Sequence, residues 1–166
     1  MPQPHARHPY TRPGLILALA AATLLACNLT SYRPTPVPPT VGAGSFVNPL
    51  VRTGLRNATA AQVQVRDASG SFVASGTITD DNLRNLLNAL DVSAQAQARD
   101  AACPDHVRLT FIKPDAGQVL LSACLKSVVI LRGLPGAVAF DVPLYGAASD
   151  ALSPYLPDEL QDLLDF

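Results

Sequence analysis

The chain has few of the residues that would mark a highly charged or strongly aromatic protein. It contains no tryptophan, one methionine and only 15% charged residues, whereas soluble domains average about 25%. The formal net charge is −1, and the chain beyond residue 26 holds ten basic and thirteen acidic residues. This small net charge argues against nucleic-acid binding and gives no reason to expect a strongly charged partner. The 166 residues suffice for one domain with its own core.

Catalytic motifs are also missing. The sequence has no Gly-x-Ser-x-Gly, no phosphate-binding glycine loop and no dinucleotide fingerprint. His106, the one histidine beyond residue 26, is expected to be a solvated turn residue. Asp105, His106 and Cys103 do not have the spacing of a zinc site, and Asp80 and Asp81 diverge if they lie on a helix. We therefore expect no enzyme activity, no catalytic residue, no bound metal and no cofactor.

The longest uncharged apolar run is too short to cross a membrane. Residues 15–26, LILALAAATLLA, would rise about 18 Å as a helix, against the roughly 30 Å of a bilayer's hydrocarbon core. Arg7 and Arg12 precede this run, which is the layout of an export signal. A short uncleaved anchor is the alternative.

The end of this run carries a recognisable motif. Leu24, Leu25, Ala26 and Cys27 resemble the lipobox of bacterial lipoprotein precursors. In that family the cysteine receives a diacylglyceryl group and a signal peptidase cuts before it, so the resemblance implies residues 1–26 as signal peptide and Cys27 as the lipidated first residue. The protein would then be attached to the extracytoplasmic face of a bacterial membrane. The alternative is an ordinary signal peptide cut near residues 20–22.

The next segment is rich in proline. Residues 28–45, NLTSYRPTPVPPTVGAGS, hold four prolines and no apolar periodicity, which favours an extended polyproline II spacer. We therefore expect a tether over residues 27–45 and a single domain over residues 46–166. A proline-rich recognition ligand is the alternative function of the segment.

Alternating apolar residues predict antiparallel strands in the domain. Val63 and Val65 alternate with polar residues, and the turn sequence at 67–70 lets residues 72–78 return as a hairpin. A second turn, at residues 114–117, joins another pair of strands. The further strands are expected at residues 107–111, 118–125 and 137–143, and residues 127–131 either continue the second of these or start another strand.

Two helices are predicted. Leucines 83, 86, 87 and 90 form one apolar stripe after Thr79, Asp80 and Asp81, which suit a helix start. Pro157 begins a second helix whose leucines 160, 163 and 164 face inward. The order ββ-α-βββ-α indicates an α+β fold with both helices on one face of a mostly antiparallel sheet. Residues 91–102 could be helix or loop.

Two cysteines remain once Cys27 is assigned to the lipid. A straight hairpin around the turn at 114–117 would leave Cys103 about 13 Å from Cys124, beyond the roughly 7 Å limit of a disulfide. A β-turn at Pro104 and Asp105 would fold Cys103 back and bring the bridge within reach. In an oxidising compartment we expect this disulfide to form.

Taken together, ITDDNLRNLLNAL, the cysteine-bracketed hairpin and LPDELQDLL resemble small uncharacterised domains of bacterial cell-surface lipoproteins. The resemblance implies architecture and location, and it brings no functional residues with it. We expect a lipid-anchored domain that binds a protein partner or a small ligand. The alternative is an accessory or protease-inhibitor-like domain that acts on another envelope protein.

Overall fold

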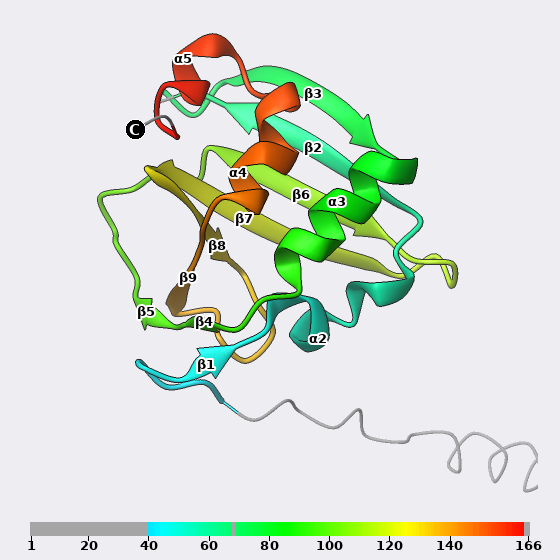
Figure 1. Cartoon of the computed structure of the whole chain (residues 1–166). Coiled ribbons are helices and arrows are strands. Elements are labelled where there is room, and N and C mark those ends of the chain that lie inside the picture. The colour runs from blue at the N-terminus through cyan, green and yellow to red at the C-terminus, as the bar shows by residue number, and fades with distance from the viewer. Residues whose placement is uncertain (1–39, 68, 165–166) are drawn as a thin grey trace, which may run out of the picture. The chain divides into compact units, whose positions relative to one another are not determined.

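Seven strands form one antiparallel sheet in the computed structural model, which describes residues 40–67 and 69–164 (Figure 1). Their order is β3-β2-β6-β7-β8-β9-β5, and β1 and β4 pair as a separate two-stranded sheet. The bounds are β1 Phe46–Val47, β2 Ala60–Arg66, β3 Phe72–Ile78, β4 Ala94–Gln95, β5 Gln97–Ala98, β6 Val107–Ile112, β7 Gln118–Lys126, β8 Val128–Arg132 and β9 Phe140–Leu144.

One face of the sheet holds the core. Val63, Leu109 and Leu121 are paired across β2, β6 and β7, and each is at most 1% exposed. Because side chains alternate between the two faces of a strand, the apolar residues of each strand meet on this side. The helices α3 (Asp80–Leu90) and α4 (Ala147–Leu152) lie next to each other across it (Figure 1). The predicted α+β fold is confirmed.

Helix α3 follows the predicted leucine stripe. Leu83, Leu86 and Leu90 are buried, whereas Leu87 is half-buried. The predicted cap is wrong in one respect: the Thr79 side chain makes no capping hydrogen bond, because its hydroxyl donates to Asp80 Oδ2 at 2.9 Å.

The second helix on this face was not predicted. Helix α4 buries Ala148 and Leu152, which is too sparse a pattern to reveal a helix in the sequence. The helix expected from Pro157 is the four-residue α5 (Asp158–Gln161), and four residues are too few to cover the sheet. The remaining helices are α2 (Pro49–Thr53) and the 3-10 turns η1 (Leu55–Asn57) and η2 (Ser153–Tyr155).

Both predicted hairpins form. Gly70 takes the left-handed conformation expected of the first turn, with φ of 82°. In the second hairpin Ile112 pairs with Gln118, whereas the turn predicted at residues 114–117 would pair Lys113 with Gln118. The register differs by one residue because the turn that forms contains five residues. The undecided segment 91–102 forms the short strands β4 and β5 and a turn rather than a helix.

Contacts with the domain already begin at Val41, inside the segment predicted as tether. Val41 is 8% exposed, and its N–H donates to Gly136 O at 2.9 Å. The predicted signal peptide, Cys27 and the proline run lie outside the described residues. Within residues 40–67 and 69–164, no helix has the length and apolar character needed to cross a membrane.

Candidate functional site

A buried arginine fixes one loop to the outer face of the sheet. Leu131 points into the core, so the next residue of β8, Arg132, points to the opposite face, where it is nonetheless only 2% exposed. Its guanidinium donates to Asp141 Oδ1 at 2.7 Å and to Asp141 Oδ2 at 3.0 Å. It also donates to Asp105 Oδ1 at 2.8 Å and to the carbonyls of Asp100 at 2.8 Å and Cys103 at 2.7 Å. Arg132 therefore holds residues 100–105 in place.

The charges of this cluster stabilise one another. The hydrogen bonds that Arg132 donates to the Asp141 carboxylate raise the pKa of Arg132 against the effect of burial, and Asp105 adds to the rise. Burial opposes ionisation of Asp141, but the hydrogen bonds from Arg132 and from the Asp100 N–H outweigh it and lower the Asp141 pKa. Both groups thus stay ionised in the folded protein. No sequence motif indicated this ion pair, since Arg132 and Asp141 lie on different strands.

The predicted disulfide between Cys103 and Cys124 is present, with the two Cα atoms 5.9 Å apart. The turn that makes it possible lies earlier than expected. The Cys103 N–H donates to Asp100 O at 3.3 Å, which closes a turn over residues 100–103. The turn was expected to be centred on Pro104 and Asp105. The disulfide and Arg132 together hold this loop against β7 and β8.

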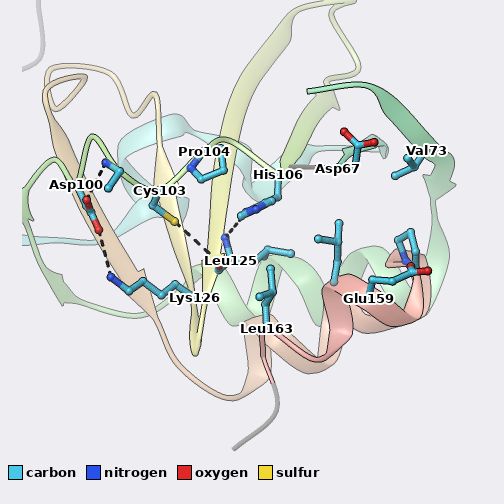
Figure 2. Close-up of a pocket in the computed structure, with 13 residues that line it drawn as sticks. Asp67, Val73, Asp100, Cys103, Pro104, His106, Leu125, Lys126, Glu159 and Leu163 are labelled. Carbon is cyan, nitrogen blue, oxygen red and sulfur yellow. Dashed lines mark hydrogen bonds and ion pairs between the residues drawn. The ribbon is translucent and has the colours of Figure 1, made fainter. Parts of the chain in front are cut away.

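His106 is not the solvated turn residue that was expected. It is only 6% exposed, and its Nδ1 accepts a hydrogen bond from the Leu125 N–H at 3.1 Å (Figure 2). Burial lowers its pKa, although the neighbouring Asp105 partly opposes this. Because Nδ1 acts as acceptor, the ring is neutral and carries its proton on Nε2. Nε2 makes no hydrogen bond with any residue that the structure describes.

The sulfurs of both cysteines and one nitrogen of His106 lie within 4.8 Å of one another. Three such ligands could hold a soft metal ion if the thiols were free. Both sulfurs belong to the disulfide, however, and Nδ1 is bound by the backbone. Asp105, the other ligand considered, is bound by Arg132 and by the Ser122 hydroxyl at 3.0 Å. In this oxidised state the arrangement offers a metal no thiolate.

A cavity of about 750 Å³ lies beside His106 (Figure 2). Most of its wall is apolar and comes from four distant parts of the chain, including Val73, Pro104, Leu125, Pro157, Leu160 and Leu163. The polar groups of the wall are Asp67, Asp100, His106, Lys126 and Glu159. One side of the wall is α5 and the residues that follow it, which are tied to the β7–β8 turn by the hydrogen bond from the Ser127 N–H to Leu163 O at 2.6 Å.

The charged groups of the cavity differ in their partners. Lys126 donates to Asp100 Oδ2 at 3.3 Å. Asp67 Oδ1 accepts from the Ser69 hydroxyl and from the N–H groups of Ser69 and Ser71, and these bonds lower its pKa. Glu159 has no hydrogen bond or ion pair with any described residue.

This geometry suits binding better than catalysis. A general base needs a free lone pair directed at the substrate, and in a catalytic triad a third group orients it. The lone pair of His106 already accepts from the Leu125 backbone, and its second nitrogen can only donate. The apolar wall with a few polar groups has the composition typical of a small-molecule site.

Comparison with known proteins adds no relative. No protein-family model, no curated protein and no solved structure matches the chain. The candidate site therefore depends on its geometry alone.

Proposed function

We propose that this protein is a bacterial lipoprotein, anchored through Cys27, whose domain binds a small, largely apolar ligand in the cavity beside His106. The observation that supports it best is the cavity itself. Its volume of about 750 Å³ falls within the roughly 300–1,000 Å³ of typical ligand pockets. The lipid anchor is supported by the motif at residues 24–27 and the proline-rich segment after it.

Rigid walls favour such a role. The loop 100–105 is fixed by the disulfide and by Arg132, so the cavity exists before a ligand arrives. A preformed site loses less conformational entropy on binding than one that must be ordered by its ligand. The tether would hold this domain away from the membrane surface.

The absence of tryptophan allows a specific test. Leu163→Trp places the chain's single tryptophan in the cavity wall, at a side chain that is already 38% exposed. Val138→Trp places it at a 62% exposed position outside the cavity and serves as the control. The full chain, as processed by a bacterial host, is titrated with octanol while tryptophan emission is recorded. A saturable shift at position 163 alone is expected, and equal or non-saturable responses at both positions would refute ligand binding in the cavity.

An accessory or inhibitory role is the second candidate, favoured by the same loop. Ala101, Ala102 and Pro104 are exposed on a segment that the disulfide holds rigid, as in a loop that inserts into a target. Such an inhibitor should slow casein hydrolysis by an envelope-protein extract of the host, and Ala102→Arg should abolish the effect. Unchanged hydrolysis at high protein concentration would remove this candidate.

A further inference from the structure

We infer that the cavity selects a cationic amphiphile, in which a protonated amine is paired with Asp67 and Glu159 and an apolar body fills the space beside His106. This inference rests on the proposed function and specifies the chemistry of its ligand. It comes from the charges of the wall, from the orientation of the Asp67 carboxylate and from the apolar residues that line the rest of the cavity.

The wall has more acidic groups than basic ones. Three carboxylates and one ammonium group line the cavity, and Lys126 is already paired with Asp100 at 3.3 Å. Neither Asp67 nor Glu159 has a cationic partner among the residues that the structure describes. Figure 2 shows both on the side of His106 away from the Asp100–Lys126 pair. One end of the cavity therefore carries two uncompensated negative charges.

Asp67 is already oriented for such a contact. Its Oδ1 accepts three hydrogen bonds, from Ser69 and Ser71, and these fix the carboxylate in the turn between β2 and β3. Its Oδ2 accepts none of them and remains available to a ligand. An oriented carboxylate loses little side-chain entropy when it pairs with a cation.

His106 offers a ligand one further polar contact. The side chain is 6% exposed, it lines the cavity, and its Nε2–H has no acceptor among the described residues. This nitrogen is reached from the cavity, where water can accept its hydrogen bond, and an acceptor atom on a ligand could take the place of that water. The charges of the wall therefore favour an amphiphile whose polar end is an amine. A fatty acid fits less well, because its carboxylate would meet two like charges.

The Leu163→Trp reporter tests this choice with three probes of equal chain length. At pH 7 octylamine is cationic, octanol is neutral and octanoate is anionic. Two partly exposed ion pairs should make octylamine bind about fivefold more tightly than octanol, and octanoate should bind most weakly.

Variants that remove the charges of Asp67 and Glu159 test whether these two residues cause the preference for octylamine. Asp67→Asn with Glu159→Gln should reduce the preference for octylamine over octanol to about twofold or less. Asp158→Asn with Asp162→Asn changes the net charge equally at exposed positions next to the cavity and should leave the preference intact. Thermal unfolding of each variant confirms that it is folded.

The possible results separate the two proposals. Saturable octanol binding with octanoate equal to or tighter than octylamine overturns the inference and leaves the proposed function standing. A preference for octylamine that persists in Asp67→Asn/Glu159→Gln also overturns it, because the selectivity would then arise elsewhere. No saturable response to any probe overturns the proposed function itself.

Discussion

Arg132 and Asp141 form a two-pronged ion pair on the outer face of the sheet, with side chains 2% and 4% exposed. Removing Arg132 would leave the buried Asp141 carboxylate with only the Asp100 N–H as a hydrogen-bond donor and with no ion-pair partner. We therefore expect Arg132→Met to lower the free energy of unfolding by about 3–5 kcal/mol, measured by urea titration. Arg132→Met with Asp141→Leu should recover part of that loss, because no buried charge remains.

A surface pair provides the matched control. Arg84 and Asp81 approach to 2.8 Å but are 72% and 83% exposed. Arg84→Met should change the free energy of unfolding by less than about 1 kcal/mol. Equal effects of Arg84→Met and Arg132→Met would show that burial does not determine the strength of the Arg132 pair.

The lowered pKa of Asp141 predicts a loss of stability in acid. The folded pKa lies below the ordinary value of 3.8, so the stabilisation is fully present above that pH and is lost as the pH falls through the folded pKa. The difference in unfolding free energy between the wild type and Asp141→Asn should accordingly shrink below pH 4. Urea titrations from pH 6 to pH 2 measure it, and a constant difference would contradict the assignment.

His106 predicts a second pH dependence, in a higher window. Its folded pKa lies below the ordinary 6.5, so the unfolded chain takes up a proton before the folded protein does. Stability should therefore fall as the pH drops from about 6.5 towards the folded pKa. His106→Asn, which retains an acceptor for the Leu125 N–H, should remove this slope between pH 7 and pH 5. The comparison is made by thermal unfolding, and identical slopes would refute the role of His106.

The disulfide should contribute about 3 kcal/mol to stability, because it closes a loop of about twenty residues. Cys103→Ser with Cys124→Ser should lower the unfolding free energy by about that amount, as measured by urea titration. Non-reducing peptide mapping of the wild type provides the control, and two free thiols there would contradict the bridge.

Cys27→Ser tests the lipid anchor. The predicted result is an uncleaved precursor without lipid, because the thiol is the atom that would carry the diacylglyceryl group. Metabolic labelling with radioactive palmitate measures this in membrane fractions, with Cys103→Ser/Cys124→Ser as the control that retains the label. Label that persists in Cys27→Ser would refute the assignment.

The fold was more predictable than the site. Helix α3 and the strands β2 and β6 have apolar residues at regular intervals along one face. This pattern in the sequence is sufficient to predict each element and the face that it buries. Helix α4 buries two residues of its six, and β4 and β5 have two residues each, so these elements depend on tertiary contacts that a local pattern does not encode.

The site eluded prediction for a related reason. His106 follows a turn, which predicts a solvated residue, but the side chain is 6% exposed and its Nδ1 accepts from the Leu125 N–H of the neighbouring strand. The pairing of Cys103, which lines the cavity, with Cys124 was identified in advance, since the chemistry of cysteine limits its partners. The charges of Asp67 and Glu159 come together only through folding, ninety-two residues apart in sequence.

The two sides of the cavity differ in the number of bonds that must break before the backbone there can move. The loop 100–105 would have to lose a disulfide and the hydrogen bonds of Arg132, whereas the side built by α5 is a single helical turn followed by the bond between Ser127 and Leu163. Local opening follows the path that breaks the fewest buried contacts. Amide hydrogen exchange should therefore be fastest on the α5 side, and under the proposed function a ligand would enter the cavity from that side.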